Sequence, residues 1–234
     1  MMQEYRLQKK LLSMAFDSEK VAKSKGKKAY KFLVYYRFFE VLSNAYPIFF
    51  TLVNRARFEK IIYKFMRYGA KSNVMWKVPN EFRKFVKKQK HFREFKFIDD
   101  LLWFEWSEVA LMMQTKKLQQ EGDFSWDHSC VMSSSASIKK LRYRVFDAPH
   151  YTQNGEFFLL AYYDRAQSRV FYREISQLLY LFLKILKKRN LMEAVVFMSE
   201  QTSEDAVAVK AFFEPTLNEL WSIGVLQNLT RSTV

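Results

Sequence analysis

The spacing at which apolar residues recur changes once along the chain, near residue 120, and this change constrains the fold more than any other feature. Before that point apolar residues return every three or four positions, as they do on one face of a helix. After it, short stretches alternate apolar and charged side chains, as half-buried strands do. The sequence therefore predicts an α+β protein: an N-terminal all-helical bundle domain over residues 1–120, then a small α/β domain with an antiparallel sheet over residues 121–234.

Helix signals divide the first half into about five helices with short links. Tyr46-Pro47 marks a corner, because proline fits the first turn of a helix, where its missing N–H costs nothing. Gly69 is placed to end a later helix. Phe32, Tyr36 and Phe39 share one helical face, which favours a packed core. The predicted helices cover residues 4–16, 29–42, 58–68 and about 97–118, with others starting at Pro47 and Pro79.

The second half mixes strands and helices. Strands are predicted at residues 138–145, 157–163 and 170–173, with a short last strand at 225–229. Asn154-Gly155 is interpreted as a turn, and Ser203 as the cap of the last helix. The predicted helices cover residues 175–188, 191–198 and the stretch from Ser203 to Trp221. A hairpin beside three helices also fits a winged-helix-like module.

The net charge, like the spacing of apolar residues, differs between the two halves of the chain. Residues 1–120 hold 26 Lys+Arg and 11 Asp+Glu, a net charge of +15, whereas residues 121–234 hold 13 of each and are neutral. Such asymmetry favours a basic domain that faces an anionic partner: nucleic acid, an acidic protein surface or a membrane surface. The alternative is an ordinary solvated, lysine-rich face.

Composition and motifs exclude several classes. With 49% apolar and 18% aromatic residues, the chain is globular rather than disordered. One cysteine makes neither an internal disulfide nor a thiolate-rich zinc site. The longest uncharged run, residues 41–54, is shorter than the ~20 residues of a membrane span. Charges are scattered through residues 1–16, so we expect no secretory signal there. We therefore expect the protein in the cytoplasm. The chain has no HExxH, GxSxG, GxGxxG or P-loop motif, so we also expect that it is not an enzyme and carries no cofactor.

Two groups of residues contain some of the side chains that bind metal ions, but neither has the spacing of a known metal site. Asp123, Asp127, His128 and Cys130 lie close together, but in a polar stretch where such residues are common. Glu105 pairs with Glu108 at three-residue spacing but lacks the histidine of a di-iron motif. We expect Glu105 to be a buried carboxylate bonded to backbone or arginine.

A basic group in the second half is the candidate contact for nucleic acid. It consists of Lys184, Lys187, Lys188 and Arg189 at the end of a predicted helix. A DNA-reading helix would carry an excess of such charge. Aromatic residues of the first half could also stack on unpaired bases, although at helical spacing they usually fill cores.

Several segments of the first half together resemble a known family. They are Tyr35-Tyr36-Arg37, Leu42 to Pro47, Leu52-Val53, Phe58-Glu59, Glu81-Phe82 with Phe85, and Leu101 to Trp106 followed by Ala110. This pattern resembles the HvfC-type family, once labelled a DNA-binding domain, over roughly residues 5–113. Three departures stand out: Asn54 replaces a usual Gly, residues 68–78 replace a His-Pro-Ser type stretch, and Trp103-Phe104 replaces a more polar pair. The motif residues, expected in an interface or the core, are Tyr36, Arg37, Tyr46, Pro47, Phe58, Phe82, Phe85, Leu102, Glu105 and Trp106.

The resemblance implies a role in maturation of ribosomally made peptides. Members of the family are encoded with a TIM-barrel enzyme that holds several iron ions and modifies cysteines of a precursor peptide, in some systems for copper binding. This chain would be the non-catalytic partner that supports the enzyme and holds the peptide leader. The leader could add a strand to an exposed edge of the small sheet, such as residues 138–145, with Leu141, Tyr143 and Val145 as the candidates, or residues 170–173. The alternative function is a DNA-binding transcriptional regulator.

Overall fold

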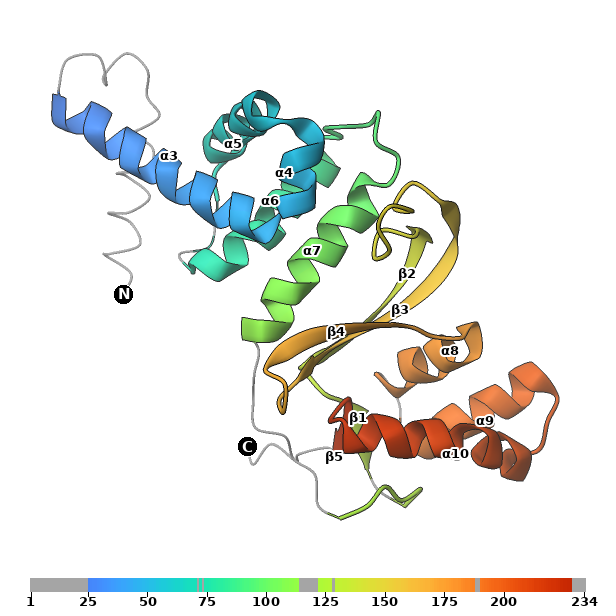
Figure 1. The fold of residues 1–234 in the computed structure, drawn as a ribbon. Helices are drawn as coiled ribbons and strands as arrows, with labels where there is room; N and C mark the ends of the chain where they lie inside the picture. Colours follow the sequence, from blue (N-terminus) through green and yellow to red (C-terminus); the bar gives the residue numbers. More distant parts are fainter. Residues whose placement is uncertain are drawn as a thin grey trace. The chain divides into compact units, whose positions relative to one another are not determined.

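The computed structural model describes residues 25–228 apart from residues 71, 73, 114–121, 128 and 188–189. These residues form two compact units, one within residues 1–106 and one within residues 107–234. Helices come first and the antiparallel sheets follow, so the predicted α+β class is confirmed (Figure 1). The predicted domain division at residue 120 stays a prediction, and the helix predicted at residues 4–16 lies outside the described residues.

Helices of the first unit begin and end near the positions that the sequence signals indicate. They are α3 (Lys25–Ala45), α4 (Pro47–Val53), α5 (Arg55–Tyr68), the 3-10 turn η1 (Met75–Lys77), α6 (Val78–Lys88) and α7 (Ile98–Met113), which continues into the second unit. Pro47 stands in the first turn of α4, and Gly69 ends α5 at φ 90°, so both predicted boundaries are confirmed. The helix predicted at residues 29–42 is longer, because the lysine-rich stretch from Lys25 belongs to α3.

Aromatic rings fill the core of the first unit. The ring of Phe82 lies among those of Phe65, Phe49 and Phe58, with centroids 5.4, 6.1 and 6.5 Å away. All four side chains are buried. Tilted and edge-to-face pairs of this kind add about 0.5–1.5 kcal/mol each beyond the burial of their area. The aromatic richness of this half is therefore explained mainly by packing.

The face of α3 that carries Phe32, Tyr36 and Phe39 is only partly covered: Phe39 is half-buried, and its ring lies 5.8 Å from that of Phe58. Phe32 and Tyr36 on α3 are 62% and 56% exposed, and their rings contact each other 5.9 Å apart. The buried face of α3 instead carries Tyr35, Phe38 and Leu42. Both sets have helical spacing, so only the packing of α3 against α5 and α6 decides which one is covered.

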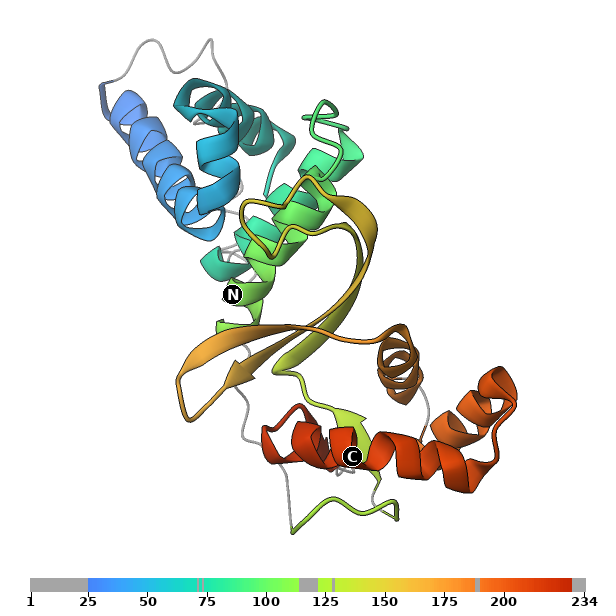
Figure 2. The same cartoon turned by 45° about the vertical axis from the view of Figure 1, so that its right-hand side comes forward.

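Two antiparallel sheets form the β part of the second unit. Strands β2 (Ala136–Tyr143), β3 (Asn154–Asp164) and β4 (Arg169–Glu174) pair in that order, while β1 (Cys130–Met132) pairs with β5 (Leu226–Asn228). The chain order of the first three strands and the presence of a last strand were predicted and are confirmed. Figure 2 shows that the long β2–β3 hairpin is strongly curved. A bulge between Leu141 and Tyr143 interrupts its register.

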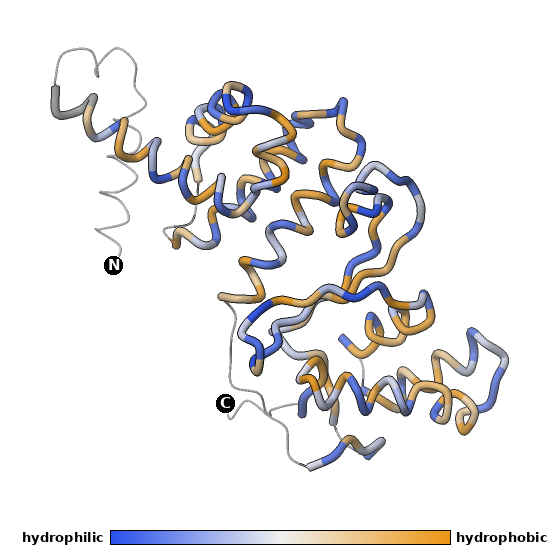
Figure 3. Tube along the Cα trace, viewed as in Figure 1, coloured by the Kyte–Doolittle hydropathy of each residue, from blue (hydrophilic) through white to orange (hydrophobic). Residues whose placement is uncertain are grey.

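Three helices complete the second unit. They are α8 (Gln177–Leu186), α9 (Leu191–Thr202) and α10 (Ala206–Ser222), and α8 contacts β1, β2 and β3. Figure 3 shows α8 as hydrophobic over most of its length, which suits a helix between the sheet and other helices. Phe182 is fully buried there, and its ring lies 4.6 Å from that of Phe213 on α10. The three-stranded sheet precedes these helices, and the strand after α10 pairs with β1.

Two local predictions in this unit are wrong for identifiable reasons. Asn154 and Gly155 begin β3 instead of forming a turn. Gly155 leaves room for the Phe157 ring, since a Cβ there would lie 2.9 Å from Cζ of that ring. Ser203 ends α9 in the left-handed conformation at φ 58°, and Asp205 caps α10 by accepting the N–H of Ala208 at 2.7 Å.

Candidate functional site

Most residues that carry the family resemblance lie in the packed core of the first unit. Tyr46, Phe58, Phe82, Phe85, Leu102 and Glu105 are buried, and Trp106 is half-buried. Tyr36, Arg37 and Pro47 are exposed. The Tyr46 hydroxyl donates a hydrogen bond to the carbonyl of Pro79 at 2.6 Å, and burial raises the pKa of this tyrosine. These motif positions therefore serve mainly to hold the helices together.

Glu105 shows how the motif builds this core. The N–H of Ile48 donates to its Oε1 at 2.5 Å, and the N–H of Phe49 donates to its Oε2 at 3.2 Å. Both N–H groups belong to the first turn of α4, where the helix dipole favours negative charge. Glu105 is thus a buried carboxylate bonded to backbone, as predicted. It fixes α7 to the start of α4.

The basic charge of the chain concentrates on α5, α6 and the segment that follows. Residues 55–96 hold 14 Lys+Arg and 3 Asp+Glu, a net charge of +11 out of the chain's +15. Several of these cations are partly compensated: Arg57 pairs with Glu94, Lys87 pairs with Asp99, and Arg55 pairs with Glu59. The remaining excess makes this surface the strongest candidate for contact with an anionic partner.

A small pocket opens on this basic surface, and we call it the α5 pocket. Its volume is about 230 Å³. One wall is a face of α5 and the other is the turn after α6. Its lining residues are Arg57, Lys60, Ile61, Lys64, His91 and Phe92. The helical spacing of Arg57, Lys60 and Lys64 could have revealed the first wall from sequence, but nothing in the sequence places His91 and Phe92 opposite them.

The three-stranded sheet offers a second candidate site, because β2 and β4 are both edge strands. Tyr163 donates its N–H to the carbonyl of Ser135 at 2.9 Å, so residues 135, 137, 139 and 141 face β3 with their backbone groups. The backbone N–H and C=O of Ile138 and Lys140 consequently point away from β3. They form the outer edge of β2.

The predicted peptide-binding residues lie beside this edge. Leu141 is fully buried, and its backbone faces β3 at Phe157. Tyr143 is half-buried next to the bulge, and Val145 is buried beyond the end of β2. The side chains of Leu141 and Val145 therefore belong to the core. An added strand would find its backbone partners at Ile138 and Lys140.

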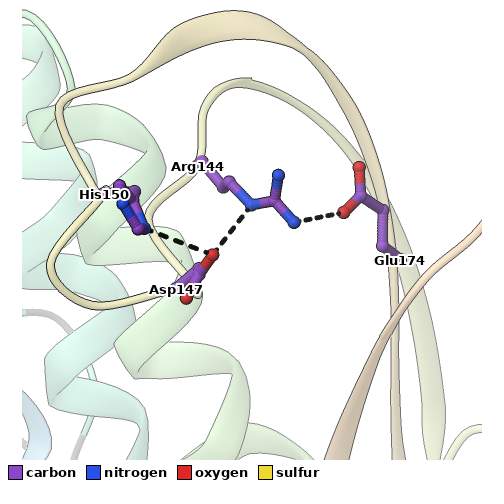
Figure 4. A network of polar contacts seen from close by, with 4 residues as sticks. All are labelled: Arg144, Asp147, His150 and Glu174. Atoms are coloured by element: carbon purple, nitrogen blue, oxygen red, sulfur yellow. Dashed lines mark hydrogen bonds and ion pairs between the residues drawn. The ribbon is translucent and has the colours of Figure 1, made fainter.

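A polar network closes the end of this sheet (Figure 4). Arg144 contacts the carboxylates of Asp147 and Glu174, each at 3.1 Å, and His150 lies 3.6 Å from Asp147. The Arg144 guanidinium also lies over the rings of Phe146 and Phe157. Arg144 thereby ties the loop of residues 144–153 to the last residue of β4, which orders the end of the hairpin.

The candidate nucleic-acid contact is only partly within the described residues. Lys184 on α8 is exposed and its ammonium lies 5.9 Å from the ring of Tyr180. Desolvation lowers the pKa of Lys187. Lys188 and Arg189 lie outside the described residues. The long helix α10 contains one lysine, Lys210, and two glutamates, Glu214 and Glu219. It therefore lacks the excess positive charge of a DNA-reading helix.

The second unit also contains an open apolar groove of about 460 Å³ between α8 and α10. Leu178 and Phe212 line it, and they are 38% and 63% exposed. Thr202 and Glu204 stand at its polar side.

Neither a metal-ligand cluster nor a membrane-spanning helix occurs among the described residues. Within that part of the chain, no three His, Cys, Asp or Glu side chains gather closely enough to hold a metal ion. His128 lies outside that part, and Cys130 is buried. No helix that the structure describes is long and apolar enough to cross a bilayer.

No protein-family model matches the chain, and no curated protein matches it significantly.

Proposed function

We propose that this protein is a non-catalytic partner subunit in the cytoplasm. It would bind a multinuclear-iron TIM-barrel enzyme and the leader of a ribosomally made precursor peptide whose cysteines that enzyme modifies, as in systems that serve copper homeostasis. The proposal combines the HvfC-type resemblance with one structural observation. A strongly basic helical unit and a nearly neutral unit whose sheet has β2 and β4 as its outer strands would provide two separate kinds of binding surface.

The basic surface of residues 55–96 would dock on an acidic face of the enzyme. Opposite charges across an interface speed the encounter and fix its orientation. Because the cations are solvent-exposed, this association would weaken as salt screens them.

The outer edge of β2 would hold the leader peptide as an added strand. Backbone pairing with Ile138 and Lys140 gives affinity that depends little on sequence, and alternate side chains give specificity. The Lys140 side chain lies next to this edge, paired with Glu156 at 2.5 Å.

Proline substitution tests the edge directly. Lys140→Pro removes an N–H that points outward, so the sheet keeps its hydrogen bonds, whereas Lys139→Pro removes an N–H that faces β3. We expect Lys140→Pro to weaken leader binding by about tenfold or more while Lys140→Ala, which lacks only the side chain, has little effect. Isothermal titration with the precursor peptide measures both affinities. Equal affinities for Lys140→Pro and Lys140→Ala would exclude β2 as the leader site.

Partner capture tests the proposal as a whole. Co-expression with the products of neighbouring genes should yield a stable complex with an iron-containing barrel enzyme, provided that a short reading frame bearing cysteines lies beside them. Neighbouring genes without such an enzyme, or an enzyme that modifies the peptide fully without this chain, would overturn the proposal.

The basic surface also supports the alternative of a DNA-binding regulator. Phosphate contacts would make the logarithm of affinity fall linearly with the logarithm of salt concentration, by about 0.9 for each contact. Nanomolar binding to duplex DNA with a steep salt slope would favour the regulator. We expect instead that the protein binds duplex DNA weakly and without sequence preference.

A further inference from the structure

The α5 pocket contains positive charge that the protein itself does not neutralise. Arg57 is paired with Glu94, but Lys60 and Lys64 form no ion pair with any described residue. Lys64 also contributes to lowering the pKa of His91, after the larger effect of desolvation. At neutral pH the pocket thus holds two uncompensated ammonium groups beside a neutral imidazole.

The walls of the pocket are held in place by packing. The Phe92 ring lies edge-on to that of Phe49 in the core at 5.1 Å, and the Arg57 guanidinium lies 5.1 Å from the centroid of the same Phe92 ring. The His91 ring lies 5.2 Å from that of Phe85. The pocket is therefore a built concavity whose aromatic wall is anchored in the core.

The turn that carries this wall is strained. Lys90 and Phe92 have φ of 53° and 59°, values that bulky side chains rarely adopt. Such strain persists where the surrounding structure holds it, and it concentrates at binding sites. Here the left-handed residues on either side of His91 turn this side chain and Phe92 toward α5.

We propose that the α5 pocket binds a phosphate monoester. Two unpaired lysines match the charge of this group, which is close to −2 at neutral pH, whereas a single carboxylate would leave one of them uncompensated. A volume of about 230 Å³ admits the phosphoryl group together with part of the group that it esterifies. Ile61 and Phe92 would contact that part. This proposal does not depend on the proposed function.

Charge removal tests the site against a matched control. Phenyl phosphate is titrated into the full-length protein, into the Lys60→Ala/Lys64→Ala variant and into Lys84→Ala/Lys96→Ala, which removes two exposed lysines outside the pocket. We expect the pocket variant to bind at least about tenfold more weakly and the control variant to bind within about twofold of the unchanged protein, because charge-assisted hydrogen bonds are local. An equal loss in both variants would overturn the proposal, since it would indicate only general charge attraction.

Histidine signals locate the ligand independently of affinity. The chain has three histidines, so each imidazole gives a resolvable proton signal, and His91→Gln assigns the one in the pocket. Phenyl phosphate should shift the His91 signal and leave that of the exposed His150 unchanged. A shift of His150 alone, or of neither signal, would place the ligand elsewhere and refute the site.

Two further probes define the ligand. Benzenesulfonate has a similar shape but a single charge, and we expect it to bind at least about fivefold more weakly than phenyl phosphate. A blocked peptide with one phosphoserine distinguishes a phosphorylated protein segment from a free small-molecule ester. If the peptide binds more tightly than inorganic phosphate, the ligand is a phosphorylated protein segment. If phenyl phosphate binds more tightly than both the peptide and inorganic phosphate, the ligand is a free small-molecule ester. Equal binding of benzenesulfonate and phenyl phosphate would contradict a site for a doubly charged group.

Discussion

Glu105 joins two helices through hydrogen bonds to the first turn of α4. Glu105→Ala leaves two backbone N–H groups without their acceptor and opens space beside α4, so we expect the free energy of unfolding to fall by about 2 kcal/mol or more. Glu108→Ala, at an exposed position of the same helix, is the control and should change it by less than about 0.5 kcal/mol. Urea denaturation followed by circular dichroism measures both. Equal effects of the two substitutions would show that the hydrogen bonds from α4 to Glu105 contribute nothing to stability.

Cys130 makes stability depend on alkaline pH. Burial raises the pKa of its thiol from 9.0 to about 12. The unfolded chain therefore loses this proton near pH 9 while the folded chain keeps it, so stability is full below pH 9 and declines as the pH rises toward 12. Between about pH 9 and 10, we expect the free energy of unfolding to fall less in Cys130→Ala than in the unchanged protein. The difference should be up to about 1.4 kcal/mol. The same burial should prevent alkylation by iodoacetamide until the protein unfolds.

At the scale of elements, Asn54 sets the angle between α4 and α5. Its φ of 60° and ψ of 163° lie in a region that favours glycine, and its side chain accepts the N–H of Arg57 at 3.1 Å. Glycine would relieve the strain and lose the cap, whereas alanine would keep the strain and lose the cap. We expect Asn54→Ala to lower the free energy of unfolding by about 1–2 kcal/mol and Asn54→Gly to leave it unchanged or raise it. An Asn54→Gly variant less stable than Asn54→Ala in urea would contradict this role of Asn54.

At the scale of the whole molecule, each unit has its own core. Phe82 is fully buried in the first and Phe182 in the second. Replacing either by alanine should cost about 3–5 kcal/mol within its own unit. Calorimetry should therefore show two transitions, with Phe82→Ala lowering the temperature of one and Phe182→Ala that of the other. A single transition that both variants shift equally would mean that the units unfold as one.

Local physics explains what could be predicted from particular residues. Pro47 and Gly69 bound helices because their backbone restrictions act within a few residues. Glu105 could be expected to be buried and bonded because a lone carboxylate among apolar neighbours needs such partners. The predictions at Gly155 and Ser203 are wrong because distant or competing contacts outweigh local propensity. At Gly155 the packing of the Phe157 ring outweighs the tendency to form a turn, and at Ser203 the neighbouring Asp205 is the better helix cap.

The sequence alone determined the α+β class, the order of helices and strands apart from β1, and the concentration of positive charge, since periodicity and charge are properties of neighbouring residues. The tertiary structure decided which face of α3 is buried, which backbone groups of β2 point outward, and that Lys60 and Lys64 share a pocket with His91 and Phe92. These outcomes depend on contacts between residues far apart in the chain. No local pattern encodes them, because helical spacing and strand alternation leave more than one way to pack.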